Sequence, residues 1–167
     1  AMLAISTAAQ AQQQLVIVAF GDSTTAPRLV NGKKLTVYCD LLEKAIFQDG
    51  LKASIVNAGQ PSDTTQGALQ RMQSDVLRLL PHLVIMQFGI NDAAVDVWRK
   101  PPADSPRVSL DDYANNLRTM IRSVQDQGGS VVLMTPNPLC WTDQLKQLYG
   151  KPPYDVQQPD GFNVLLR

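Results

Sequence analysis

The stretch Leu15-Val-Ile-Val-Ala-Phe20, followed by Gly21-Asp22-Ser23-Thr24-Thr25, decides the fold. Its first six residues are continuously apolar and a glycine closes them, which is typical of a strand buried on both faces of a parallel sheet. The polar residues that follow lie where such a strand passes into its loop. The stretch therefore predicts a central strand with a serine, Ser23, just beyond its carboxyl end.

Three more short runs rich in β-branched residues end at Gly, Pro or Asn, and they predict strands at 53–57, 83–88 and 130–135. Apolar residues between the runs recur at helical spacing. They are Val37, Leu41, Leu42, Ala45 and Ile46, then Leu69, Met72, Val76 and Leu80, then Tyr113, Leu117, Ile121 and Val124. Strand and helix therefore alternate, which predicts an α/β fold of three layers, α/β/α, with a parallel sheet.

Capping residues agree with the three helices. Asp63 or Thr64 can begin the second helix, Ser109 with Asp112 forms a capping box at the third, and Gly128-Gly129 ends it. Past Gly161, Asp160 can cap a further helix that would run on to Arg167. A chain that stops inside an amphipathic helix suggests truncation, so we expect the last strand and the C-terminal helix to be missing.

Size and charge limit the function classes. A chain of 167 residues that is 44% hydrophobic predicts one domain, which we place at residues 15–167. Lys plus Arg and Asp plus Glu number 15 each, so no net field favours nucleic acid or an anionic membrane surface, and a neutral or small substrate is expected. No apolar run approaches the roughly 20 residues of a membrane span.

Residues 1–14 are small or apolar and then rich in glutamine, and Ala9-Gln10-Ala11 fits the site that signal peptidase cuts. They predict the remnant of an export signal, with a frayed, disordered N-terminus as the alternative. The protein is therefore expected to be periplasmic or extracellular. Cys39 and Cys140 have no metal-binding spacing; they can pair in an exported protein if their distance allows, and otherwise are small buried hydrophobes.

Two more loops follow strand ends. Residues 57–65 lead into a helix N-terminus, where free N–H groups favour an oxyanion, and Gly89-Ile90-Asn91-Asp92 offers an asparagine amide as a second donor. Each motif alone is an ordinary turn or cap. Long connections at 93–108 and 136–161 also follow strand ends, and their Trp98 and Trp141 either line a substrate pocket or pack their own loops.

Taken together, Gly-Asp-Ser, the second loop and Gly-x-Asn-Asp resemble the SGNH hydrolases, the GDSL-like esterases and lipases, from about Leu15 onward. The resemblance implies a flavodoxin-like sheet, no metal or cofactor, Ser23 as nucleophile and backbone oxyanion donor, and Asn91 as a further donor. The family's glycine donor falls on Ser62, where a side chain makes glycine-type conformations costly. Supporting positions in the same loops are Asp22, Gly59, Gly89 and Asp92.

The family's Asp-x-x-His is absent from this sequence, whose only histidine is His82. A strand from His82 to Gly89 is about 20 Å long at about 3.3 Å per residue, so His82 should lie at the opposite edge from Ser23. Hydrogen-bond contact needs about 3 Å. We therefore expect an esterase when the protein is intact, and little or no turnover from residues 1–167 alone.

Other interpretations remain. A nucleotide-binding domain lacks both glycine-rich phosphate motifs. A non-catalytic ligand- or carbohydrate-binding relative that lost its histidine is the stronger alternative. The Gly-Asp-Ser-Thr-Thr form resembles carbohydrate-directed acetylesterases, which would make an O-acetyl or short-acyl ester of a small molecule or a sugar the substrate, whereas lysophospholipase and thioesterase relatives share the same loops.

Overall fold

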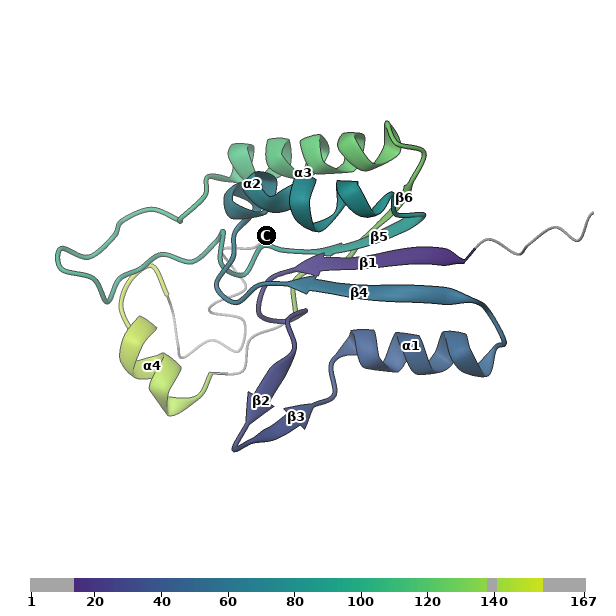
Figure 1. Cartoon of the computed structure of the whole chain (residues 1–167). Helices are drawn as coiled ribbons and strands as arrows, with labels where there is room; N and C mark the ends of the chain where they lie inside the picture. The colour runs from purple at the N-terminus through teal and green to yellow at the C-terminus, as the bar shows by residue number, and fades with distance from the viewer. Residues whose placement is uncertain (1–13, 138–140, 155–167) are drawn as a thin grey trace, which may run out of the picture.

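A four-stranded parallel sheet forms the centre of the molecule (Figure 1). The computed structural model describes residues 14–137 and 141–154. In sheet order the strands are β4 (Ala53–Gly59), β1 (Leu15–Gly21), β5 (Leu83–Gln87) and β6 (Ser130–Leu133). In the register, Gly21 lies between Gly59 and Gln87, so the carboxyl ends of the three neighbouring strands meet at one edge. The predicted α/β class and parallel sheet are confirmed.

Helices cover both faces of the sheet (Figure 1). The upper face in this view carries α2 and α3, and α1 lies below the sheet. Their bounds are α1 (Tyr38–Gln48), α2 (Thr65–Asp75) and α3 (Leu110–Gln125), with a short 3-10 turn, η1 (Leu77–Leu79), after α2. The side chain of Thr64 caps α2 by accepting from Gly67 N, and Ser109 caps α3 by accepting from Asp112 N, so the predicted caps are present.

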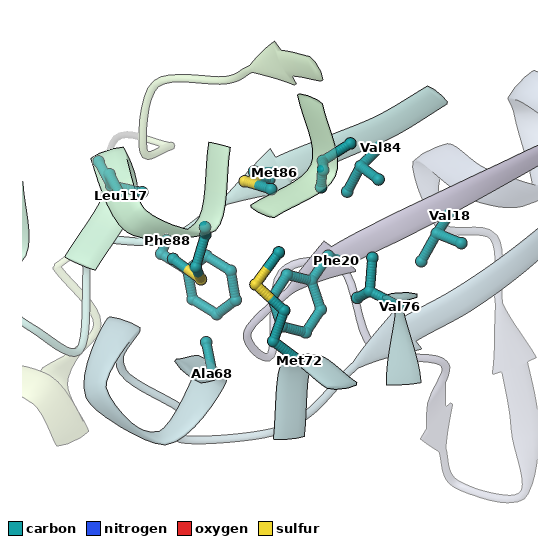
Figure 2. Close-up of a cluster of buried hydrophobic side chains, with 11 residues drawn as sticks. Val18, Phe20, Ala68, Met72, Val76, Val84, Met86, Phe88 and Leu117 are labelled. Carbon is teal, nitrogen blue, oxygen red and sulfur yellow. The ribbon is translucent and has the colours of Figure 1, made fainter. Parts of the chain in front are cut away.

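The main core lies between the sheet and the α2–α3 layer (Figure 2). Its buried residues come alternately from the strands and from the inner stripes of both helices. They are Val18, Phe20, Ala68, Met72, Val76, Val84, Met86, Phe88, Leu117, Met120 and Val124. Phe20 and Phe88 meet edge to face with ring centroids 5.2 Å apart. The removal of these side chains from water is the main source of the free energy that holds α2 and α3 on the sheet.

The face below the sheet is covered less completely. In α1 only Cys39 is buried, while Leu41 is 60% and Phe47 82% exposed. On β6, whose one partner among the described strands is β5, Val132 is 47% exposed. The predicted apolar stripe of α1 therefore contacts the sheet through only part of its length.

The second helix is shorter than its apolar stripe predicted. It ends at Asp75, and Leu80 adopts φ 48° with its side chain 69% exposed. Pro81 follows, and a proline disfavours helical backbone at the residue before it. Assigning Leu80 to the buried stripe was therefore wrong.

A hairpin and a helix were not predicted. A hairpin of β2 (Arg28–Val30) and β3 (Lys33–Leu35) projects beneath the sheet edge, and α4 (Asp143–Tyr149) lies in the second long connection. The hairpin turn, Asn31-Gly32, has positive φ at both residues, 50° and 74°. Asn-Gly between two short strands is the standard signal for such a turn, so the sequence contained it.

Several expectations lie outside the described residues: the export-signal remnant apart from Gln14, Cys140, and the helix expected after Asp160. Cys39 is buried, as expected for a small hydrophobe. Among residues 14–137 and 141–154, no helix has the length and apolar character that crossing a bilayer requires.

Candidate active site

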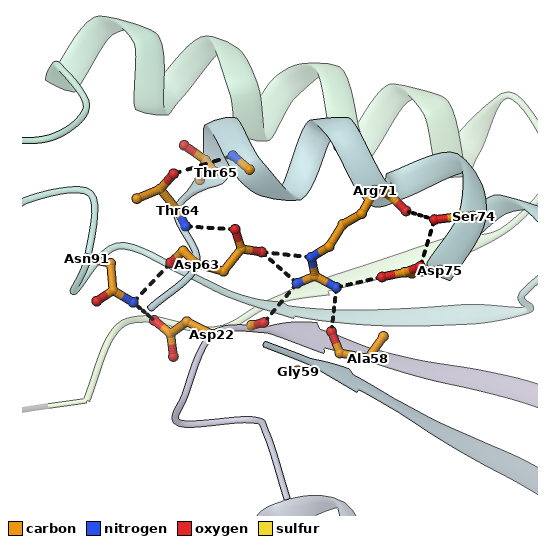
Figure 3. Close-up of polar contacts among 12 residues, drawn as sticks. Asp22, Ala58, Gly59, Asp63, Thr64, Thr65, Arg71, Ser74, Asp75 and Asn91 are labelled. Carbon is orange, nitrogen blue, oxygen red and sulfur yellow. Dashed lines mark hydrogen bonds and ion pairs between the residues drawn. The ribbon is translucent and has the colours of Figure 1, made fainter. Parts of the chain in front are cut away.

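The three predicted loops meet at the carboxyl edge of the sheet (Figure 3). The first follows β1, the second follows β4, and the third follows β5. Gly59 brings the first two loops into close contact, because a Cβ at this position would overlap the backbone of Ala26. Asn57 links the same loops: its Nδ2 donates to Thr25 O at 2.8 Å and its Oδ1 accepts from Gly59 N at 3.0 Å.

Ser23 lies half-buried in the first loop with its hydroxyl free. Neither its Oγ nor its N–H forms a hydrogen bond with another described residue. The loop is held from both sides, since Asp22 O accepts from Ala26 N and the Asp22 carboxylate accepts from Thr24 N at 2.8 Å. Asp22 is 1% exposed and is occupied in closing this turn. The turn therefore fixes a serine whose nucleophilic atom and amide are both unengaged.

The second loop contributes another free amide. Ser62 adopts φ 64°, the left-handed region that favours glycine, so a side chain occupies a backbone shape that costs about 1 kcal/mol or more outside glycine. Asp63 N donates to Gln60 O at 3.3 Å and closes the turn around it. Among the described residues nothing accepts the Ser62 N–H. The α2 N-terminus that follows adds the positive end of its dipole to the same region.

The third loop places Asn91 between the other two. Its Nδ2 donates to Asp63 O at 2.9 Å and lies 3.4 Å from Asp22 Oδ2 (Figure 3). The second contact is long, so one amide hydrogen is held firmly and the other only weakly. The loop needs Gly89, which has φ 130° and has Pro136 and Tyr113 where a Cβ would stand.

Asp92 anchors this loop to α2. It is 2% exposed, and its Oδ1 accepts from both the N–H and the hydroxyl of Thr65, at 2.8 and 2.5 Å. Its Oδ2 has no partner in the described part of the chain. Burial, reinforced by the charge of Asp22, raises the pKa of Asp92 above 3.8 against the effect of the Thr65 hydrogen bonds.

Arg71 is a residue of the site that the sequence did not reveal. Each nitrogen of its guanidinium donates at least one hydrogen bond, and its side chain is 13% exposed. Its partners are Asp63 Oδ2 at 2.7 Å from both Nε and Nη2, Gly21 O at 3.0 Å, Ala58 O at 2.8 Å and Asp75 Oδ2 at 3.1 Å (Figure 3). One guanidinium therefore ties together the ends of β1 and β4 and the second loop. Sequence spacing does not identify Arg71 as a residue of the site, because its partners outside α2 come from three separate elements.

The guanidinium of Arg71 also lies 4.4 Å from the ring centroid of Phe20 in the core. The second loop is thus connected to the packed layer beneath it. Because Asp63 O is also the acceptor for Asn91, the position of that amide depends on the same arginine.

His82 lies at the other edge of the sheet. It directly precedes β5, and its Nδ1 accepts a hydrogen bond from Val16 N, near the start of β1, at 3.1 Å. The structure therefore does not bring His82 together with Ser23.

The two tryptophans differ in their surroundings. Trp98 is 46% exposed, with the Arg99 guanidinium 5.7 Å from its ring. Trp141 is half-buried and meets Tyr154 edge to face at 6.2 Å, in a small cluster beneath the 93–108 loop. Asp96 fastens that loop through ion pairs to Arg99 and Arg107, at 2.6 and 2.7 Å.

Comparison with known proteins agrees with this geometry. Residues 19–159 match the GDSL-like Lipase/Acylhydrolase family. An arylesterase of Vibrio mimicus is 30% identical over 130 residues, covering 78% of this chain and 58% of the relative. An acetylxylan esterase of Geobacillus stearothermophilus is 30% identical over 108 residues, or 63% of this chain and 47% of the relative. The chain spans about half the length of the curated relatives it matches.

Solved structures give the same assignment. A lipase/acylhydrolase from Enterococcus faecalis superposes with a TM-score of 0.63 at 29% identity, covering 92% of this chain and 70% of that one. A catalytic mutant of an acetylxylan esterase from Geobacillus stearothermophilus, at 20% identity and a TM-score of 0.65, shares the fold over 93% of this chain and 72% of its own. The chain therefore belongs to the GDSL-like lipase/acylhydrolase family.

Proposed function

We propose that the protein is a serine esterase that hydrolyses carboxylic esters, with O-acetyl or other short acyl groups, through an acyl-enzyme on Ser23. One observation carries the proposal: a serine with a free hydroxyl shares the sheet edge with two unengaged N–H groups, of Ser23 and Ser62, and with the amide of Asn91. Three donors around one nucleophile suit a tetrahedral oxyanion.

In the proposed reaction Ser23 Oγ attacks the ester carbonyl carbon as a base accepts its proton. The carbonyl oxygen becomes an oxyanion, held by the N–H groups of Ser23 and Ser62 and by the Asn91 amide. Collapse of this intermediate expels the alcohol, which takes the proton from the base. Water then attacks the acyl-enzyme by the same steps, releasing the carboxylic acid and restoring the serine.

Neither candidate for this base within the 167 residues is suitable. The only histidine of the 167 residues, His82, is bound at the opposite sheet edge. Asp22 is buried and closes the nucleophile's own turn. We therefore propose that a base from outside these residues completes the site, and that residues 1–167 alone turn over little or no ester.

A fluorophosphonate probe and 4-nitrophenyl acetate test the nucleophile. Both should be applied to residues 1–167 and to the product of the uninterrupted reading frame. Labelling and hydrolysis are expected in the longer form, with loss of both in Ser23→Ala. Equal labelling of Ser23→Ala would refute the assignment.

The missing histidine also favours a second function, a non-catalytic binder of ligands or carbohydrates that has kept the pocket. The two candidates separate in the longer form. Binding of acetylated sugars without any hydrolysis, although a histidine is present beyond residue 167, would favour the binder.

The acyl preference rests on the relatives, an arylesterase and an acetylxylan esterase. A panel of acetyl, butyryl and longer esters, together with acetylated xylan, tests it. The fastest hydrolysis is expected for acetyl esters, and faster hydrolysis of long chains would point to a lipase or thioesterase.

We propose export from the cytoplasm on the evidence of Ala9-Gln10-Ala11. A mature N-terminus beginning just after Ala11, found by sequencing the exported protein, is the expected result. A protein that stays in the cytoplasm with these residues intact would contradict export.

A further inference from the structure

A pocket of about 290 Å³ lies beside the nucleophile's loop, on the hairpin side. Thr24, the residue after Ser23, lines it together with Arg28 of β2, Gln87 at the end of β5 and Asn137 after β6. Val37 and Met134 add apolar wall. The pocket therefore combines polar groups with enough apolar surface to hold a small ring or chain.

Arg28 is the one charged residue among the residues that line this pocket. Its Nε donates to Ser23 O at 2.8 Å, which positions the guanidinium directly beside the nucleophile. In the described part of the chain no carboxylate pairs with Arg28, and its two terminal nitrogens donate no hydrogen bond. A guanidinium with a free pair of donors matches the two oxygens of a carboxylate.

The surrounding charge has the same sign. Residues 28–36 contain Arg28, Lys33 and Lys34 and no Asp or Glu. Lys34 is neutralised by Asp40 at 2.7 Å, which leaves two cations on the hairpin. The acid that precedes the hairpin in the chain, Asp22, is buried, and its oxygens face Thr24 and Asn91. The balanced total charge of the chain therefore conceals a positively charged hairpin, whose Arg28 lies beside Ser23.

We propose that this pocket binds a carboxylate carried by the ester substrate, and that Arg28 determines this specificity. Resting on the proposed esterase function, the proposal names its substrate class: esters whose alcohol part bears a carboxylate, such as acidic sugars or hydroxy acids. This substrate class differs from the neutral or small substrate expected from the sequence, because that expectation was based on the total charge of the chain alone. The carboxylate on the alcohol part of the ester would bridge the two terminal nitrogens of Arg28, while the rest of that alcohol contacts Val37 and Met134 in the pocket.

Binding is tested without turnover, in the 167-residue chain itself. Sodium benzoate and benzyl alcohol share a ring and differ in charge, and backbone amide NMR shifts at Thr24 and Gln87 report occupancy. Benzoate is expected to bind and Arg28→Gln to weaken it about five- to tenfold, less at high salt, whereas benzyl alcohol should be unaffected. Inorganic phosphate should bind more weakly than benzoate, because it cannot use the apolar wall.

Arg118→Gln is the matched control, since Arg118 is exposed on α3 and, within the described part of the chain, donates only to Asn115. It should leave benzoate binding unchanged. Equal benzoate affinity in Arg28→Gln and wild type would overturn the proposal, as would binding of benzyl alcohol as tight as that of benzoate. Phosphate that binds more tightly than benzoate would also overturn the carboxylate assignment.

The second test measures ester turnover and uses the active form of the enzyme. Because 3-carboxy-4-nitrophenyl acetate and 4-nitrophenyl acetate differ by one carboxylate, the ratio of their kcat/KM values measures the effect of that charge on turnover. Because Arg28 also holds the Ser23 carbonyl, Arg28→Gln should lower both rates, but the ratio should fall about five- to tenfold and recover in part in Arg28→Lys. An unchanged ratio would refute Arg28 as the specificity residue. Arg28-dependent benzoate binding without turnover of either ester would count against the esterase and support the pocket.

Discussion

The two faces of the sheet contribute differently to the site. Above the sheet, α2 and α3 cover a continuous core, and the second and third loops emerge from that layer tied by Arg71 and Asp92. Below it, α1 leaves Phe47 82% exposed, and among the described strands β2 and β3 of the hairpin pair only with each other. Two of the three proposed oxyanion donors, Ser62 and Asn91, thus lie in loops tied to the densely packed side, whereas Arg28 of the proposed substrate pocket lies on the sparse side. In this proposal, groups that must hold a fixed geometry are better anchored than groups that meet a variable substrate.

The largest expected effect comes from emptying the packed face. Phe20→Ala removes a side chain that is fully buried against Phe88, and should lower the free energy of unfolding by about 3–5 kcal/mol. Phe47→Ala on the sparse face should change it by less than about 0.5 kcal/mol. Urea unfolding of both variants measures the contrast. Similar losses would mean that the two faces are equally packed.

Removing Arg71 should have the next largest effect. Arg71→Met leaves Asp63 buried without its partner and should cost about 3 kcal/mol of unfolding free energy. Adding Asp63→Asn removes the unpaired charge and should restore part of that loss. On the sparse side the exposed Lys34–Asp40 pair provides the control, and Lys34→Met should unfold like wild type. No recovery in the double variant would contradict a coupled pair.

Asp92 should make the packed face sensitive to pH. Burial raises its pKa in the folded chain above the usual 3.8, so the folded state holds the proton more tightly than the unfolded state does. The contribution of Asp92 is therefore most favourable at low pH and is lost as pH rises through the folded pKa. The stability of Asp92→Asn relative to wild type should increase as the pH rises above about 4. A stability difference that does not depend on pH would show that the pKa of Asp92 is not raised in the folded chain.

The smallest change concerns the second loop. Ser62→Gly relieves a left-handed residue of about 1 kcal/mol of strain but makes the unfolded chain more flexible, so the net gain should be about 0.5 kcal/mol. The backbone N–H is retained, and ester turnover in the active form should stay within a few-fold. Thermal unfolding and kcat report the two quantities. Destabilisation by glycine would show that the Ser62 side chain makes a compensating contact.

Much of this architecture could be predicted because it is local. Leu15–Phe20 predicted a strand buried on both faces, and the caps at Thr64 and Ser109 were visible as residue types. The order of the three loops predicted that Ser23, Ser62 and Asn91 share one sheet edge, because parallel strands align their carboxyl ends.

What escaped prediction depends on contacts between distant segments. Arg71 gains its role from the ends of β1 and β4 and from Asp63, and no periodicity encodes such a meeting. The hairpin was a different omission: its Asn31-Gly32 signal is local and was overlooked because the strands are only three residues each. Total charge could not reveal the place of Arg28 either, since a sum over 167 residues does not say which side chain lies next to Ser23.

The pairing of β2 with β3 bears on how the chain can be redesigned. Within residues 14–137 and 141–154 the hairpin shares no ladder with the main sheet, so its residues can be lengthened, shortened or exchanged without breaking a hydrogen bond between the central strands. If the pocket beside Ser23 takes the alcohol part of the substrate, as we propose, such changes alter specificity while Arg71 and the core still hold the second loop. Because Arg28 also holds the Ser23 carbonyl, a small library that keeps Arg28 and varies residues 29–36 would sample specificity at little risk to folding.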